Sequence, residues 1–299
     1  MGNSKRADLA ARIRRRDFFI APGVYDMVSA RVADAMGFTA LYMTGYGVTA
    51  SYLGMPDIGL ASYRDMVGRA GQIAANSETP LIADADTGYG GLLNVRQTIR
   101  GYEAAGVAGL HIEDQVDPKR CGHTPGKKVV PTKDMVRKLE VAVDSRESDD
   151  FIIIARTDAR APLGLDEACR RAEAYAKAGA DVLFVEALDG EEEMELVGRR
   201  FDHPLLINIT GGLTPVLPSE QLREMGYTIA IYPGAAFGAA ALAVKGVYES
   251  LKKDGSTLDC PVPRMAGMDM HEMMGFPEVW AFESKWAEDE PGSEDEAAE

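Results

Sequence analysis

The sequence predicts a protein of the α/β class, a (β/α)8 TIM barrel with an additional C-terminal helix. Eight short runs rich in β-branched and aromatic residues alternate with Ala-rich helical patterns between residues 18 and 252. Strands that alternate with helices in this way form parallel sheets. Four of the helical patterns also end at a glycine, so the chain returns repeatedly from helix to strand. This regular alternation favours a closed barrel.

The predicted strands are short, and several are almost entirely apolar, as in FIIIA at 151–155 and LLINI at 205–209. Continuous apolar runs are typical of parallel strands that are covered on both faces. The eight predicted strands are 18–21, 40–44, 81–85, 109–113, 151–156, 182–186, 205–209 and 228–232.

Helical patterns fill the intervals between most of these strands. A glycine directly after the last helical residue ends a helix, and Gly37, Gly106, Gly179 and Gly226 stand at such positions. A doubly wound sheet is the alternative, but no GxGxxG follows the first strand. The predicted helices are 27–36, 92–105, 132–147, 166–178, 191–200, 219–225 and 238–252.

The chain continues beyond the predicted barrel, which we assign to residues 1–255. Residues 256–286 form a helical extension whose last segment, 276–286, has an aromatic face, and an acidic tail, 287–299, is predicted to be disordered. An apolar helix outside a completed barrel needs a surface to pack against. A neighbouring subunit would provide it, so we expect a homo-oligomer.

Composition limits the partners and the compartment. The net charge of −15 argues against nucleic acid and membrane surfaces as partners. The three cysteines are widely spaced and form no CxxC, which indicates reduced thiols rather than a disulfide framework. The first residues contain no apolar signal segment. We therefore expect a cytoplasmic protein.

Polar side chains lie at the ends of nearly all predicted strands. Active sites of such barrels lie at the carboxyl ends of the strands, where these side chains would converge. The alternative is that they only cap helices. The set comprises Asp26, Tyr42, Thr44, Asp84, Asp86, Glu113, Arg156, Asp158, Glu186, Asn208, Thr210 and Tyr232.

Three of these acids predict a metal site. Asp84 and Asp86 share one face of a strand end, and Glu113 ends the next strand. Three carboxylates suit a hard cation, Mg²⁺ or Mn²⁺, whereas zinc ligands at suitable spacing are missing from the sequence. Helix capping by Asp86 is the alternative. Nearby, Arg156 offers a fork for a substrate carboxylate.

A polar loop at about 116–131 follows Glu113 and is predicted to be a mobile lid. It contains Cys121, flanked by Lys119, Arg120 and His123. Positive charge favours the thiolate, so we expect Cys121 to titrate near neutrality and to exchange a proton with substrate. The alternative is an incidental cysteine in a surface loop.

Together these motifs resemble those of the isocitrate lyase / phosphoenolpyruvate mutase superfamily. YMTGYG, DADTGYGG, HIEDQ, PKRCGH with KKVVP, ARTDA, FVEA and NIT follow one another in order, and the resemblance covers about residues 18–286. The KRCGH segment is similar to that of the carbon–carbon lyase branch. The mutase, phosphonopyruvate hydrolase and oxaloacetate decarboxylase branches lack this cysteine.

The resemblance implies a role for each site residue. Cys121 would be the proton donor, supported by His123, and Tyr42 or a metal-linked carboxylate would be the base. Asp84, Asp86 and Glu113 would hold Mg²⁺, with Asp57 in the outer shell. Thr44, Gly45 and Tyr46 would join Tyr42 in binding the 2-oxoacid portion. Arg156 would hold a carboxylate, with Glu186, Asn208 and Thr210 nearby. The resemblance also implies a tetramer with swapped C-terminal helices.

Two details bear on the substrate. Phe184 in FVEA and Pro233 in AIYP resemble 2-methylisocitrate lyases, in which a small apolar pocket accepts a methyl group. Gly211 and Gly212, however, replace the family's acidic residue after NIT. GGLTP, together with TGYGV and ESKW, more closely resembles lyases for 2-alkylmalates such as 2,3-dimethylmalate.

The implied reaction is Mg-dependent cleavage of a 2-hydroxy di- or tricarboxylate. The products would be a 2-oxoacid such as pyruvate and a carboxylate such as succinate or propionate. An oxaloacetate decarboxylase or a phosphonate mutase on the same scaffold is the nearer alternative. A non-catalytic metabolite-binding barrel is the other.

Overall fold

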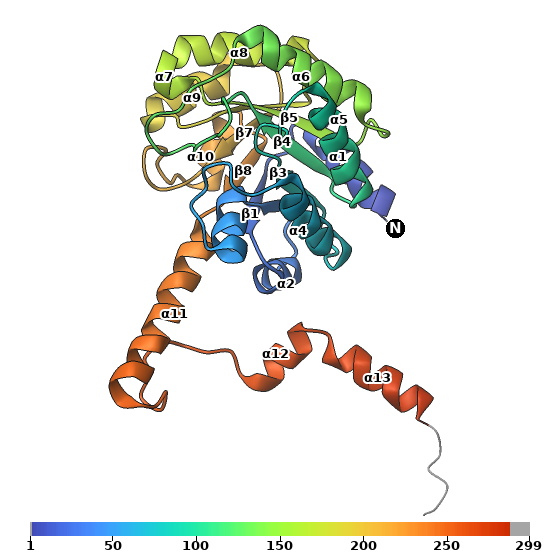
Figure 1. The fold of residues 1–299 in the computed structure, drawn as a ribbon, viewed down its shortest axis with the longest axis vertical. Helices are drawn as coiled ribbons and strands as arrows, with labels where there is room; N and C mark the ends of the chain where they lie inside the picture. The colour runs from blue at the N-terminus through green and yellow to red at the C-terminus, as the bar shows by residue number, and fades with distance from the viewer. Residues whose placement is uncertain (1, 288–299) are drawn as a thin grey trace, which may run out of the picture. The chain divides into compact units, whose positions relative to one another are not determined.

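A computed structural model describes residues 2–287 and contains a closed barrel of eight parallel strands, which confirms the predicted fold (Figure 1). Each strand pairs with its sequence neighbours, and β1 closes the barrel against β8 through the pair Phe19 and Ile229. The strands are β1 (Phe19–Val24), β2 (Leu41–Met43), β3 (Leu81–Asp84), β4 (Gly109–Glu113), β5 (Ile152–Thr157), β6 (Val182–Val185), β7 (Leu205–Asn208) and β8 (Ile229–Tyr232).

Helices within residues 27–224 lie around the outside of this barrel, and further helices precede and follow them in the chain (Figure 1). Those predicted from the sequence are present with small shifts at their ends: α2 (Met27–Ala35), α5 (Leu92–Ala104), α6 (Thr132–Ser145), α8 (Leu165–Lys177), α9 (Gly190–Arg200), α10 (Ser219–Glu224), α11 (Ala235–Asp254) and α13 (Phe276–Trp286). The sequence analysis missed others: α1 (Gly2–Arg14), α3 (Gly45–Val48), a π-helical turn (Thr49–Leu53), α4 (Tyr63–Ala75), α7 (Arg160–Leu163) and α12 (Gly267–Met273).

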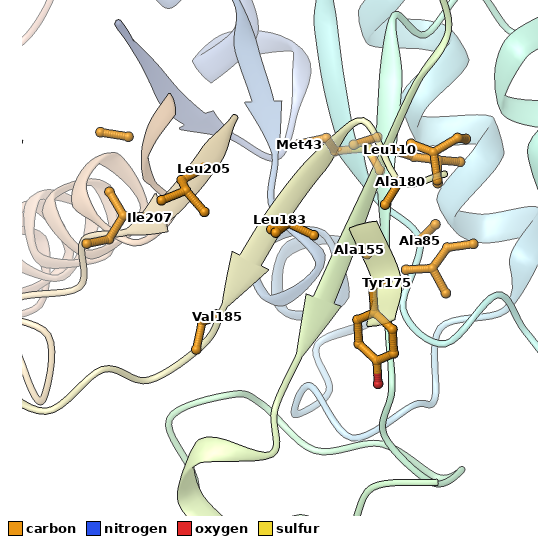
Figure 2. Close-up of a cluster of buried hydrophobic side chains, with 14 of the residues drawn as sticks. Met43, Ala85, Leu110, Ala155, Tyr175, Ala180, Leu183, Val185, Leu205 and Ile207 are labelled. Carbon is orange, nitrogen blue, oxygen red and sulfur yellow. The ribbon is translucent and has the colours of Figure 1, made fainter. Parts of the chain in front are cut away.

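The alternation of side chains along each strand divides the core into two clusters. One face of the strands packs against the helices, and Figure 2 shows part of this outer cluster, including Met43, Leu110, Leu183 and Ile207. The other face fills the barrel interior with residues such as Tyr42, Ile82, Ile154 and Phe184. Two residues further along a strand, the same inward face carries Asp84 and Arg156, so interior packing directs the strand-end polar groups toward one another.

The N-terminal helix α1 contributes Leu9, Ala10 and Ile13 to the interior cluster. These side chains join Phe19 and Ile229, which open β1 and β8. Helix α1 therefore closes the end of the barrel opposite the carboxyl ends of the strands.

The four predicted glycine stops are confirmed, because Gly37, Gly106, Gly179 and Gly226 all have φ between +71° and +102°.

One of the polar residues predicted at the strand ends caps a helix. Asp26 accepts a hydrogen bond from the backbone N–H of Ser29 at 2.8 Å and caps α2.

The described chain divides into two compact units between Leu242 and Ala243. The second unit contains the end of α11 together with α12 and α13. The side chains of Phe276, Trp280 and Trp286 in α13 are 42–64% exposed. The predicted acidic tail, apart from Ala287, lies outside the described residues. No helix within residues 2–287 is both long enough and apolar enough to cross a membrane.

Candidate active site

A cavity of about 420 Å³ lies at the carboxyl ends of the barrel strands. Most of the residues predicted for the site line it, which supports the convergence expected from their positions. These residues are Tyr42, Thr44, Tyr46, Asp57, Asp84, Cys121, His123, Arg156, Glu186, Asn208, Thr210 and Pro233.

Four predicted residues do not line this cavity. Phe184 is fully buried in the barrel interior, where its ring lies 5.2 Å from the Arg156 guanidinium, so it supports the site from below. Gly45 donates its backbone N–H to Asp84 Oδ2 at 3.2 Å and so fixes a carboxylate. Glu113 is fully buried, and Asp86 faces a second cavity.

The lid lysine lies among the four predicted metal-binding acids. Lys119 Nζ is 2.5 Å from Asp57 Oδ1 and 2.7 Å from Asp86 Oδ1, and only 3% of the side chain is exposed. Burial would lower the pKa of Lys119, but the charges of Asp86, Glu113, Asp84 and Asp57 raise it well above its usual value. The acids thus already hold a cation, one that the chain itself supplies.

The same acids fit a hard divalent cation. Both carboxylate oxygens of Glu113 are buried, and neither has a hydrogen-bond partner among the described residues. Burial raises the pKa of Glu113 well above its usual value and the pKa of Asp86 to about 7. A divalent cation bound by these carboxylate oxygens would provide the missing partner. Within residues 2–287, however, no three His, Cys, Asp and Glu side chains lie close enough together to hold a metal ion as they stand.

Arg156 is engaged differently from the predicted fork for substrate. Its Nε and NH2 atoms donate to Asp158 Oδ2 and Oδ1 at 2.9 and 3.1 Å, which is a bidentate pair within the chain. Its Nε is also 3.3 Å from Glu113 Oε2. Arg156 nevertheless lines the cavity, so it offers a buried positive charge in a fixed orientation.

The lid lies across the barrel mouth and is joined to it at several points. The Cys121 N–H donates to the backbone oxygen of Asp57 at 3.1 Å. His123 Nε2 lies 2.7 Å from Glu186 Oε1, and Asn208 donates to the same oxygen at 3.1 Å. Burial opposes the ionisation of Glu186, but Arg156 and the hydrogen bond from His123 lower its pKa to about 2. Glu186 is therefore an anion that holds the lid histidine.

The expected thiolate at Cys121 is wrong. Burial raises the pKa of Cys121 above its usual value, and Asp57 acts in the same direction. The cation expected to favour the thiolate, Lys119, is already paired with Asp57 and Asp86. Cys121 is consequently a thiol at neutral pH, in the protonation state that a proton donor needs.

His111, which was not predicted from the sequence, contacts Tyr42 in the site. Its Nε2 atom is 2.8 Å from the Tyr42 hydroxyl, and burial lowers the pKa of His111 to about 4. Its Nδ1 has no hydrogen-bond partner among the described residues, so the tautomer with hydrogen on Nε2 costs less. Tyr42 then accepts from His111 and is free to donate its own proton. The only signal in the sequence was a histidine two residues before Glu113 in a strand.

Comparison with known proteins identifies the family. The family described as phosphoenolpyruvate phosphomutase matches residues 9–252. The chain belongs to the isocitrate lyase / phosphoenolpyruvate mutase superfamily. The resemblance inferred from the motifs is thereby confirmed.

Within this superfamily, the chain is similar to named lyases. It is 43% identical over 275 residues to 2,3-dimethylmalate lyase of Eubacterium barkeri, covering 90% of this chain and 95% of the relative. It is 41% identical to 2-methylisocitrate lyase of Aeropyrum pernix, with coverage of 88% and 85%. The expected lyase branch and the class of carbon–carbon lyase are confirmed.

Solved structures of the superfamily share the fold. A crystal structure of 2,3-dimethylmalate lyase superimposes with a TM-score of 0.88 at 40% identity, covering 94% of this chain and 95% of that chain. Phosphonopyruvate hydrolase in complex with oxalate and Mg²⁺ superimposes with a TM-score of 0.86 at 28% identity, with coverage of 94% and 99%.

Proposed function

We propose that the protein is a Mg²⁺-dependent carbon–carbon lyase that cleaves a 2-alkylmalate of the 2,3-dimethylmalate type into pyruvate and propionate. The observation that carries the proposal is the position of Cys121. Its protonated thiol faces the same cavity as Asp84 and Arg156. A buried proton donor opposite a carboxylate cluster suits a reaction that forms a carbanion and then protonates it.

Asp84, Asp86 and Glu113 would hold the divalent cation, with Asp57 in its outer shell, and Mn²⁺ would be an alternative ion. The related phosphonopyruvate hydrolase binds Mg²⁺ and oxalate, a small dicarboxylate. When bound, the cation would polarise the substrate hydroxyl and its neighbouring carboxylate.

The charges of the cavity favour a dicarboxylate. Arg156 is the one arginine or lysine among the lining residues, whereas the far side is formed by Gly212, Leu213, Pro233 and Gly234. A third substrate carboxylate would find no cationic side chain there, but an alkyl group would be accommodated. Methylisocitrate, a tricarboxylate, is therefore the second candidate, supported by the relatives with that name.

Tyr42, Cys121 and His123 would have separate roles: Tyr42 would donate a hydrogen bond, Cys121 would donate the proton, and His123 would hold the lid. Burial raises the pKa of Tyr42 well above its usual value, so it stays a phenol and donates a hydrogen bond to the 2-oxoacid oxygen. This favours a carboxylate of the acid cluster as the base for the substrate hydroxyl. As the C2–C3 bond breaks, its electron pair goes to C3, and the Cys121 thiol donates its proton to that carbon. The closed lid, held through His123 and Glu186, excludes water during this step.

A substrate panel tests the activity. The purified protein with Mg²⁺ is offered 2,3-dimethylmalate, methylisocitrate, isocitrate, citramalate and oxaloacetate, and 2-oxoacid release is measured. We expect pyruvate from 2,3-dimethylmalate, its loss in EDTA and its recovery with Mg²⁺ or Mn²⁺. Full turnover in excess chelator would contradict the metal role.

Cys121→Ser tests the proton donor. The near-isosteric hydroxyl is a much weaker acid, so kcat should fall by roughly 10²-fold or more at little change in KM. Cys260→Ser, in the second unit, is the matched control and should leave kcat unchanged. A near-normal Cys121→Ser enzyme would favour a decarboxylase or phosphonate mutase on this scaffold. No turnover of any compound would favour a metabolite-binding barrel.

The exposed aromatic face of α13 supports a homo-oligomer, which we propose is a tetramer with swapped C-terminal helices. We also propose a cytoplasmic location, since the three cysteines are free thiols.

A further inference from the structure

A second cavity of about 520 Å³ lies beside the candidate active site. The lid contributes Asp117, Pro118 and Lys119 to its wall, and the segment after β3 contributes Asp86, Thr87 and Tyr89. Residues of α4 and α5, among them Tyr63 and Gln97, form another part of the wall.

A single ion-pair cluster separates the two cavities. Asp57 lines the active-site cavity, whereas Asp86 and Lys119 line the second one. The Lys119 ammonium bridges the two carboxylates at 2.5 and 2.7 Å. A movement of this one side chain would therefore open a path from Asp86 in the second cavity to Asp57 in the active-site cavity.

The wall of the second cavity suits a hydrated cation. It carries hydroxyl and amide groups from Thr87, Tyr63 and Gln97 and carboxylates at Asp86 and Asp117. Its one cationic side chain, Lys119, is already paired with Asp86. Asp117 is exposed at the outer side, where Thr87 Oγ1 donates to its Oδ1 at 2.8 Å. Mg²⁺ gives up its waters reluctantly, and six waters fill roughly 180 Å³ at ~30 Å³ each. The cavity exceeds that volume.

The lid forms the wall of the active-site cavity next to Asp57. Cys121 and Gly122 line the cavity there, and the backbone N–H of Cys121 donates to the backbone oxygen of Asp57 at 3.1 Å. The part of that cavity near Gly212 and Leu213 lies on the segment after β7, away from the acids of β3 and β4.

We propose that the second cavity is the entry route of the divalent cation, and that Lys119 occupies the acid cluster until the arriving cation displaces its ammonium. Substrate enters separately, on the side of Leu213. This inference rests on the proposed metal dependence of the lyase. Gln97 and Asp117 would then affect the rate at which the metal ion binds, but they would not be ligands of the bound ion.

The test measures Mn²⁺ binding to the full-length protein without substrate. The EPR signal of free Mn²⁺ gives the association rate and the dissociation constant, and a chase with EDTA gives the dissociation rate. Gln97→Trp narrows the route without touching an expected ligand. Because a barrier acts equally in both directions, association and dissociation should both slow by about tenfold, with the dissociation constant changed less than about twofold.

Three further variants complete the test. Asp117→Asn keeps the hydrogen bond from Thr87 but removes a surface charge, so association should slow several-fold and depend less on salt. Leu93→Trp, on the same helix but outside the cavity wall, should leave both rates unchanged. Leu213→Trp should leave Mn²⁺ rates unchanged because it obstructs the substrate side.

The outcomes separate the two proposals. Wild-type rates in both Gln97→Trp and Asp117→Asn, or slow Mn²⁺ binding in Leu213→Trp, would overturn the entry route and leave the metal-dependent lyase intact. A wild-type protein that binds no Mn²⁺ would remove the metal from the proposed function, and the entry route with it.

Discussion

Gly45 is the position at which a single methyl group should disable the site without disturbing the rest of the barrel. A Cβ atom at residue 45 would lie 2.4 Å from Asp84 Oδ2 and 2.9 Å from Asp84 Cγ. Carbon atoms in contact normally stay about 3.5 Å apart, so the Asp84 carboxylate must move by about 1 Å. Asp84 now accepts hydrogen bonds from the backbone N–H of Gly45 and of Asp86 at 3.2 and 2.9 Å.

The size of the effect follows from this displacement. Leaving a buried polar group unsatisfied costs about 1–3 kcal/mol, so Gly45→Ala should lower the free energy of unfolding by that amount. A catalytic group misplaced by about 1 Å can lose roughly 10²-fold in rate. We therefore expect kcat for 2-oxoacid release to fall about 10²-fold and Mn²⁺ binding, followed by EPR, to weaken.

Gly68→Ala is the matched control for this variant. Gly68 is exposed on α4, and a Cβ added there meets no atom within 4 Å. Alanine is favoured over glycine inside a helix by about 1 kcal/mol, so this variant should be fully active and slightly more stable to urea. If Gly45→Ala bound Mn²⁺ and turned over like Gly68→Ala, Asp84 would have no part in metal binding or catalysis.

Three further predictions concern stability, the lid and assembly. Burial lowers the pKa of His111 to about 4 in the folded protein, whereas the unfolded chain takes up this proton near pH ~6.5. The free energy of unfolding should therefore fall by about 3 kcal/mol as the pH drops from ~6.5 to ~4. Urea unfolding of His111→Gln should lose this dependence, and an unchanged slope would contradict the assignment. Arg171 Nη1 donates to Asp114 Oδ2 at 3.0 Å and to the backbone oxygen of Val130, at the end of the lid, at 2.8 Å. Arg171→Lys should therefore loosen this end of the lid and speed its cleavage by trypsin several-fold. Equal cleavage of the two proteins would show that these hydrogen bonds do not hold the lid. Truncation after Gly275 removes the exposed aromatic face of α13 and should lower the sedimentation coefficient, and a soluble truncated chain with an unchanged coefficient would exclude helix swapping.

The strands and most site residues could be predicted from the sequence because one physical rule governs both. Inward and outward side chains alternate along a strand, so the apolar interior residues Ile82 and Ile154 are followed two positions later by Asp84 and Arg156. The carboxyl ends of parallel strands then bring these polar groups to one place. The same periodicity describes the outer cluster in Figure 2, in which Leu183 and Val185 lie two positions apart on one strand.

The helices missed from the sequence have weaker signals. Among residues 4–14 of helix α1, whose side chains the structure describes, only Leu9, Ala10 and Ile13 are buried, so the apolar stripe there is narrow. Helix α4 contains Gly68 and Gly71, which lower its intrinsic preference for helix, and its burial in the fold compensates.

Contacts between distant segments were also beyond the sequence. The charge of Lys119 suggested a thiolate at its neighbour Cys121, but the lysine pairs instead with Asp57 and Asp86, which are far away in the chain. Local charge spacing cannot reveal a partner that only the fold supplies. The same reason hid the contact between His111 and Tyr42, which are 69 residues apart.

The closure of the barrel through β1 and β8 has a consequence for how the chain is made. Strand β1 has only one partner, β2, until Ile229 to Tyr232 have left the ribosome. At ~5–20 residues per second, the roughly 200 intervening residues take about 10–40 seconds to synthesise. During that interval β1 and the newest strand are unpaired edges that can join other nascent chains. Slow translation prolongs this exposure, so the yield of soluble protein should depend on how quickly β8 follows β1.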